Sequence, residues 1–126
     1  MMFIAGRIDA AKFKLAGFEV LTEDVVLTEP QIQHIREDHP GDYDKYQQFI
    51  PAVLAEPDYI VEANKADSAV LLKHIEQDEI RFQLVLRLKM ERDPKEFRNS
   101  IITFWRIEEK RYLRYLRTKK VLYKQE

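Results

Sequence analysis

The chain has 126 residues, 45% of them hydrophobic and 34% charged, with a formal net charge of -1, a balance that predicts one globular domain over residues 1–126. Because it has no cysteine, disulfides, thiolate metal sites and cysteine nucleophiles are excluded, and a reducing cytoplasm is compatible with the composition. The apolar run at the start is too short for a signal peptide, and no stretch approaches the roughly 20 apolar residues of a membrane span, so we expect neither export nor membrane insertion.

The first 25 residues predict an N-terminal arm or short strands, because Gly6 and Gly17 interrupt their apolar stretches. A helix is then expected from Thr28, which can cap it, with Gln31 three residues later as in a capping box. This helix should stop before Pro40, because proline disfavours helical geometry in the residue that precedes it.

A second helix is expected from Asp42, with a kink at Pro51 and an end near Pro57. Its apolar face is defined by residues that recur at helical spacing, namely Tyr46, Phe49, Ile50, Val53 and Leu54.

Four strands are expected next, at Tyr59–Ala63, Val70–Ile75, Ile80–Lys89 and Asn99–Ile107. In the third strand, apolar residues alternate with mostly polar ones, so one of its faces should meet water or a ligand. With the segment that follows, the predicted fold class is α+β: N-terminal helices, then a four-stranded antiparallel sheet, then a basic C-terminal helix.

The last segment, EEKRYLRYLRTKK, predicts a helix with a cationic side and an apolar side, the latter formed by Tyr112, Leu113 and Leu116. From Arg98 onward, the chain has nine basic and three acidic residues, so the remaining residues carry a formal charge of -7. A basic pole of this kind can attract phosphate, and a solvated charged helix is the alternative. The candidate RNA-binding residues are Lys110, Arg111, Arg114 and Arg117, interleaved with aromatic residues on which bases could stack.

Two of the three histidines, His34 and His39, stand close together at the end of the first expected helix. Imidazole both takes and gives a proton near neutral pH, so such a pair suits general acid and base roles, with helix capping or packing as the alternative. Their spacing of five residues and the lack of a third ligand argue against zinc, and we expect no metal site.

Lys73, Arg87, Ser100 and Thr103 are the remaining candidates for a catalytic site. Cationic side chains on strands could stabilise charge that develops on a phosphate, and Arg87 comes from the polar face of the third strand. Ser100 and Thr103 could hold phosphate oxygens, but their opposite parity requires a turn or a bulge before both can face one ligand. For each of these residues, ordinary exposure is the alternative.

Other enzyme classes are excluded by missing motifs. The chain has no nucleophile elbow, no phosphate-binding P-loop and no glycine-rich dinucleotide turn, since it holds only three glycines. Serine hydrolase, ATPase and dehydrogenase activities are therefore not expected. We also expect no cofactor.

The order of four segments resembles the phage-associated nuclease-like domains of the Barnase, EndoU, colicin and RelE superfamily. These segments are VVLTEPQIQHIREDHP at Val25–Pro40, EPDYI at Glu56–Ile60, LLKHI at Leu71–Ile75, and NSIITFWRIEEKRYLRYLRTKKVLYK at Asn99–Lys124.

The resemblance implies helices followed by a four-stranded antiparallel sheet, with a metal-free ribonuclease site on the sheet. It assigns that site to His34 and His39, Lys73, and the hydroxyls of Ser100 and Thr103, while Arg87 is added from strand alternation. Asp67-Ser68 replaces the Asn-Thr pair that the family often shows, so that part of the site departs from the pattern.

The primary hypothesis is thus a toxin-like endoribonuclease that cleaves RNA by attack of the ribose 2'-hydroxyl, with histidine acid and base catalysis and without a cofactor. A neutralising protein partner would accompany such an activity, and the sequence does not specify one. The alternative is a noncatalytic accessory domain of a phage or mobile element that binds RNA, DNA or an acidic protein, because members of this superfamily can keep the fold and lose activity.

Overall fold

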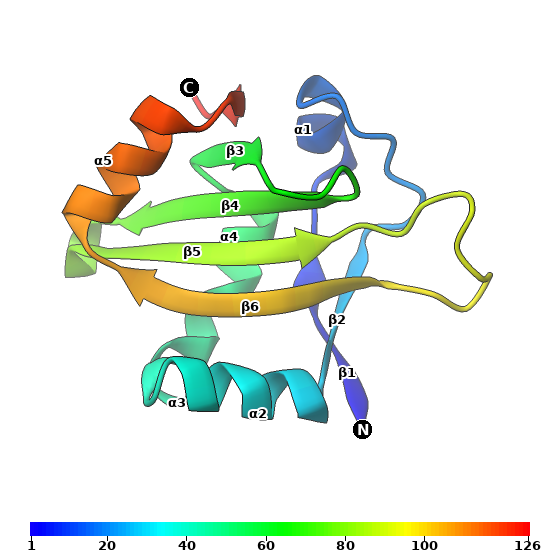
Figure 1. Ribbon diagram of the computed structural model, residues 1–126, viewed down its shortest axis with the longest axis horizontal. Helices are drawn as coiled ribbons and strands as arrows, with labels where there is room; N and C mark the ends of the chain where they lie inside the picture. The colour runs from blue at the N-terminus through cyan, green and yellow to red at the C-terminus, as the bar shows by residue number, and fades with distance from the viewer.

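The computed structural model describes residues 1–126, and the chain begins and ends in β-strands (Figure 1). The first half comprises β1 (Met2–Arg7), α1 (Ala10–Leu15), β2 (Asp24–Thr28), α2 (Glu29–Asp38), α3 (Asp42–Tyr46), a 3₁₀ turn (Gln47–Phe49) and α4 (Ile50–Ala55). The second half comprises β3 (Tyr59–Glu62), β4 (Ser68–Ile75), a 3₁₀ turn (Glu76–Asp78), β5 (Ile80–Arg87), β6 (Asn99–Ile107), α5 (Glu109–Thr118) and β7 (Val121–Lys124).

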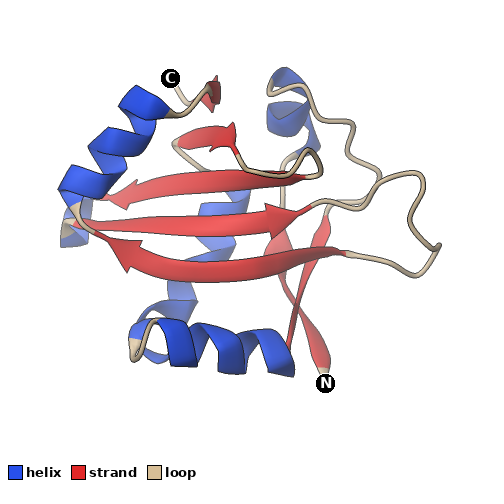
Figure 2. Ribbon diagram, in the orientation of Figure 1, coloured by secondary structure: helices blue, strands red, loops and turns tan.

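The strands form one seven-stranded mixed sheet in the order β1-β2-β6-β5-β4-β3-β7 (Figure 2). Neighbouring strands are antiparallel except β2 and β6, which run parallel over a short pairing. The expected four-stranded antiparallel sheet is therefore wrong, as is the expectation that helices precede all of the sheet, although the fold is α+β.

β2 and β7 were missed, and β1 lies where an arm or short strands were expected, because the stability of these strands comes from distant partners rather than from a local pattern. β2 is a short apolar run that pairs with β6, more than 70 residues later, and β7 has four residues and pairs with β3. In β1, Gly6 interrupts the pattern, and the pairing with β2 shifts its register between Ile4 and Gly6. Short strands of this kind are identified only when the strand beside them is known.

The four strands expected from the sequence are confirmed as β3 to β6, with β4 beginning two residues earlier than expected. The second expected helix is interrupted near Pro51, since a 3₁₀ turn separates α3 from α4 and Pro51 lies in the first turn of α4. This agrees with the missing N–H of proline, which a first turn tolerates and a helix interior does not.

The expected cap of α2 is confirmed, because Thr28 Oγ1 accepts a hydrogen bond from the Gln31 N–H (3.3 Å). The Gln31 side chain does not complete a capping box and instead donates to the carbonyls of Ile101 (3.4 Å) and Ile102 (2.8 Å) in β6. These bonds fasten α2 along the part of β6 that β2 leaves unpaired (Figure 1).

The two faces of the sheet are covered differently. On the core face, side chains such as Phe82 and Leu84 pack under α1, α3 and α4 in a cluster of 21 buried residues. On the opposite face, called the α5 face here, Tyr112 of α5 packs with Val61, Leu72 and Ile107 in a smaller cluster. From strand alternation and register, the α5 face carries Ser68, Val70, Leu72, His74, Arg81, Gln83, Val85, Arg87, Ser100, Thr103, Trp105 and Ile107.

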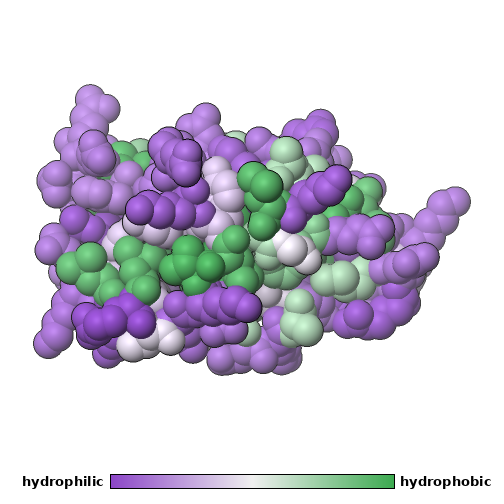
Figure 3. Space-filling view, turned by 90° about the horizontal axis from the view of Figure 1, so that it is seen from above, coloured by the Kyte–Doolittle hydropathy of each residue, from purple (hydrophilic) through white to green (hydrophobic).

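The side of the molecule near β7 mixes charged and apolar side chains, and Figure 3 shows an apolar band among hydrophilic residues there. The exposed apolar side chains include Leu15 of α1, Leu113 of α5 and Val121 of β7. Lys120 precedes the edge strand β7, and Lys124 is its last residue. Charged residues on an edge strand oppose its pairing with a strand of another chain. None of the helices has the length and apolar character needed to cross a membrane.

Candidate functional site

The two histidines at the end of α2 have different surroundings. His34 is 59% exposed in its side chain, and its Nε2 lies 3.2 Å from Asp38 Oδ2 one turn later on the same helix. His39 caps the C-terminus of α2, and its ring stacks on that of Trp105, with 4.2 Å between centroids and an angle of 8°. Because Trp105 lies on the α5 face, only His39 is held at the border of that face.

Lys73 lies on the other side of the sheet. It pairs in register with Phe82, a residue of the core face, and its Nζ is 3.6 Å from Asp58 Oδ1. Successive residues of a strand point to opposite faces, so the neighbour of Lys73, His74, lies on the α5 face instead. The structure therefore does not bring Lys73 together with His39.

Arg87 lies on the α5 face, but carboxylates already occupy its guanidinium. Nη1 and Nη2 donate to the two carboxylate oxygens of Asp93 (2.8 and 3.1 Å), and Nε is 3.3 Å from Asp67 Oδ2. The hydrogen bonds from Arg87 and from the Met90 N–H hold the pKa of Asp93 well below its usual range. Arg87 thus anchors the loop between β5 and β6, and no donor fork is free for phosphate.

Ser100 and Thr103 share the α5 face because a β-bulge lies between them. Thr103 pairs with Val85 and Ser100 with Arg87, while the register shifts by one residue at the intervening step. A bulge places one extra residue in a strand and reverses the parity beyond it. The bulge that their opposite parity in the sequence requires for both residues to face one ligand is therefore present. Thr103 lies two residues from Trp105 on the same strand face.

Helix α5 presents a row of exposed cations without ion-pair partners. Its acidic residues are engaged, since Glu109 lies 3.1 Å from Arg81 and Glu108, its N-cap, lies 3.3 Å from Arg106. The expected RNA-binding residues are all exposed and form no ion pair, and they are Lys110, Arg111, Arg114 and Arg117. A cationic surface of this kind attracts a chain of phosphates.

Arg111 connects α5 to the stacked pair of rings. Its guanidinium carbon lies 5.7 Å from the Trp105 ring centroid, and its Nη2 donates to Tyr115 Oη (3.2 Å). His39, Trp105, Arg111 and Tyr115 thus follow one another along the border between the sheet and α5. Planar rings and a guanidinium in one surface suit the stacking of bases and the binding of phosphates.

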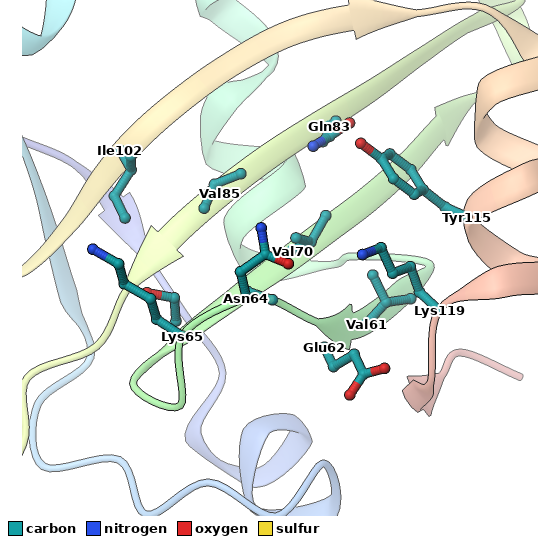
Figure 4. Close-up of a pocket in the computed structure, with 12 residues that line it drawn as sticks. Val61, Glu62, Asn64, Lys65, Val70, Gln83, Val85, Ile102, Tyr115 and Lys119 are labelled. Atoms are coloured by element: carbon teal, nitrogen blue, oxygen red, sulfur yellow. The ribbon is translucent and has the colours of Figure 1, made fainter.

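A hollow of about 290 Å³, called the Gln83 pocket here, opens on the α5 face beside Tyr115 (Figure 4). Val61, Val70, Val85 and Ile102 contribute apolar side chains to its lining. Sequence reasoning missed this pocket, and the available signal was Gln83 itself, a polar residue in the strand that alternates most clearly.

A second hollow, of about 450 Å³, lies near the start of α5 and is lined by residues that include Asp58, His74, Arg81, Glu109 and Tyr112. Its polar groups are largely engaged: Asp58 Oδ2 accepts from the His74 N–H (2.7 Å), and Arg81 pairs with Glu109. Burial raises the pKa of the Tyr112 phenol well above its usual range, so this phenol stays protonated. The Arg81–Glu109 ion pair fastens α5 to β5, and the Asp58–His74 hydrogen bond fastens the residue before β3 to β4.

Unpaired cations and stacked rings beside a sheet are features of domains that act on phosphate chains. A family model described as phage-Barnase-EndoU-ColicinE5/D-RelE like nuclease2 (PBECR2) matches residues 8–124, so the chain belongs to this family. The resemblance carried by the four sequence segments is thereby confirmed, and the family makes a nuclease the general class of function. The comparisons with curated proteins and with solved structures gave no match.

Proposed function

We propose that the protein is a metal-independent endoribonuclease that cleaves RNA on its α5 face, with His39 as the proton-transferring group. Membership of a nuclease-like family supports a nuclease in general. The observation that carries the finer proposal is the stacking of His39 on Trp105, next to Arg111, which has no ion-pair partner, with Thr103 two residues from Trp105 on the same strand face. A proton-transfer group, a hydrogen-bond donor and a cation are the parts that cleavage next to a ribose requires.

Substrate binding in this proposal depends on α5. Its exposed cations hold the phosphates, and the acidic remainder of the molecule repels them, so the RNA is confined to the α5 face. Tyr115 adds an aromatic surface at the same border. Stacking is tolerant of sequence, because every base has a π-face.

In the proposed reaction, the ribose 2'-oxygen attacks the adjacent phosphorus while its proton passes to a ring nitrogen of His39. The P–O2' bond forms as the P–O5' bond breaks, the 5'-oxygen leaves with a proton from water, and the hydroxide that results takes the proton back from His39. The products are a 2',3'-cyclic phosphate and a 5'-hydroxyl. Thr103 and Arg111 stabilise the charge on the nonbridging oxygens, a part that Lys73 and Arg87 cannot take while aspartates hold them.

The experiment incubates labelled RNA in EDTA with the unchanged protein, with His39→Ala and with His34→Ala. We expect the first and third to produce 2',3'-cyclic phosphate ends, and His39→Ala to be slower by about 10²-fold or more, the usual loss when an acid–base group is removed. DNA of the same sequence should stay intact, because it lacks the 2'-hydroxyl. Circular dichroism of each variant controls for folding, and cleavage at an unchanged rate by folded His39→Ala would contradict the proposal.

A noncatalytic binding module is the second candidate. The observation that favours it is the engagement of Lys73 and Arg87 by aspartates, while the unpaired cations lie on the outer helix. Binding of RNA without cleavage by all three proteins in the same assay would support this candidate and not the enzyme.

A further inference from the structure

The Gln83 pocket contains polar atoms that have no partner within the protein. Ser68 is 5% exposed and Gln83 is 4% exposed, and neither Ser68 Oγ nor Gln83 Oε1 forms a hydrogen bond. Leaving buried polar groups unpaired is unfavourable, and nearly all such groups in folded proteins have a partner. Both residues line the pocket, so a ligand that enters it can supply the missing hydrogen bonds once these side chains rotate toward it.

The lining of the pocket combines apolar side chains with a polar amide. Val70 and Val85 offer contact to a ring face, and Figure 4 shows the Tyr115 side chain and Gln83 pointing toward one another across the pocket. A side-chain amide presents an acceptor and a donor side by side, the pattern that pairs with the edge of a nucleobase. A volume of about 290 Å³ is at the lower end of the range for small-molecule sites.

Cations border the pocket on two sides. Lys65 comes from the β3–β4 turn and Lys119 from the end of α5, and Figure 4 shows them on opposite sides of the pocket. Neither lysine forms an ion pair, so both are available to phosphates that flank a bound base.

We infer that the Gln83 pocket is a nucleobase subsite, which takes one unstacked base of a single-stranded RNA and pairs its edge with the Gln83 amide. The inference rests on the proposed function, because it makes the same α5 face the RNA-binding surface. The pocket adjoins the proposed cleavage position through Tyr115, whose hydroxyl accepts from Arg111 beside Trp105 and His39. The base in the pocket therefore selects which phosphate reaches His39.

The test measures binding of 2'-O-methyl RNA, which cannot be cleaved by 2'-hydroxyl attack, by fluorescence anisotropy. Gln83→Leu keeps a side chain of similar size and removes the amide, and Gln77→Leu, at an exposed turn outside the pocket, is the matched control. We expect Gln83→Leu to weaken binding about tenfold, the scale of one bidentate base contact, and Gln77→Leu to leave it unchanged.

Abasic probes show whether a base is the ligand. A set of oligonucleotides with one abasic position each is titrated against the unchanged protein and Gln83→Leu. At one position, the abasic substitution should weaken binding to the unchanged protein, because the Gln83 amide then has no base to pair with. The same substitution should not weaken binding to Gln83→Leu, in which the amide is already absent. Additive losses at every position, or equal affinity of folded Gln83→Leu and the unchanged protein, would overturn the subsite.

The outcomes separate this inference from the proposed function. Gln83-dependent binding without cleavage of ordinary RNA would support the subsite and contradict the endoribonuclease. Cleavage that depends on His39 and is indifferent to Gln83→Leu in both rate and site preference would support the enzyme and contradict the subsite.

Discussion

At the scale of single residues, the structure divides the cations by whether a carboxylate already holds them. Arg87 and Lys73 are each held by aspartates, whereas Arg111 meets only aromatic groups. A guanidinium that is held by two carboxylate oxygens is a structural anchor, because moving it would break charge-assisted hydrogen bonds. Residue type alone does not distinguish these roles.

Asp93→Asn should lower the free energy of unfolding and reduce its dependence on acid. The pKa of the Asp93 carboxyl is lowered in the folded protein, chiefly by the hydrogen bond from Arg87, so its contribution to stability is present above the unfolded pKa of about 3.9 and is lost progressively as pH falls from there toward the lowered folded pKa. Urea unfolding between pH 7 and pH 3 measures this, with Asp78→Asn as an exposed control. If the free energy of unfolding of Asp93→Asn fell with pH as steeply as that of the unchanged protein, the role of Asp93 as an anchor would be contradicted.

Trp105→Ala should lower kcat/KM for RNA cleavage about five- to tenfold, because it removes the surface on which the His39 ring is stacked. Aromatic pairs contribute about 0.5–1.5 kcal/mol beyond their buried area. Trp105 is proposed as a positioning residue, so the loss should fall mainly on kcat, and Trp105→Phe should recover most of it. A loss confined to KM, with no recovery in Trp105→Phe, would instead indicate direct contact with RNA.

At the scale of elements, α5 combines a buried side with a cationic outer side. Tyr112 packs against β3 to β6, while Arg114 and Arg117 face solvent. The interleaved pattern of the sequence predicted both sides, but Leu113, expected on the apolar side, is 49% exposed. The helix is thus held by the buried Tyr112 ring, by the partly buried Tyr115 and Leu116 and by the Arg81–Glu109 ion pair, while its outer cations stay free.

Arg114→Gln should weaken RNA binding at low salt and reduce the dependence of log K on log salt by about 0.7 if that arginine contacts one phosphate of a single strand. Lys14→Gln, an exposed cation of α1, should leave this slope unchanged. Anisotropy titrations from about 50 to 200 mM salt measure the slopes. Equal slopes for the two variants would exclude α5 as the phosphate-binding element.

At the scale of the whole molecule, one aromatic cluster joins the sheet to the helices of the core face. The Phe82 ring lies 5.2 Å from that of Tyr46, 5.4 Å from that of Phe49 and 5.1 Å from that of Phe104. Because this cluster connects β5 and β6 to α3 and the turn after it, we expect the sheet and these helices to unfold together.

Phe82→Ala should lower the free energy of unfolding by about 3–5 kcal/mol, since Phe82 is fully buried and its removal leaves a cavity. Phe3→Ala is the matched control, because Phe3 in the edge strand β1 is 37% exposed and should lose far less. Urea unfolding followed by fluorescence and by circular dichroism measures both variants. Separate transitions for the two probes would contradict cooperative unfolding.

Local patterns were sufficient for the elements that local forces decide. Alternation along Ile80–Lys89 located β5, the β-branched and aromatic residues of Asn99–Ile107 located β6, and the Thr28 hydroxyl marked the start of α2. Helix periodicity, capping and strand alternation depend on residues that are close in the sequence, so the local sequence determines them. The four segments from Val25 to Lys124 also indicated the family, because their order is a property of the sequence.

Tertiary structure alone decided which of these residues meet. The parallel pairing of β2 with β6, the bulge that turns Ser100 and Thr103 to one face, and the separation of Lys73 from His39 all depend on strands that are distant in sequence. The Gln83 pocket likewise needs β4, β5 and α5 side by side. Such contacts depend on the closure of long loops and on the fit between buried surfaces. A short stretch of neighbouring residues does not contain that information.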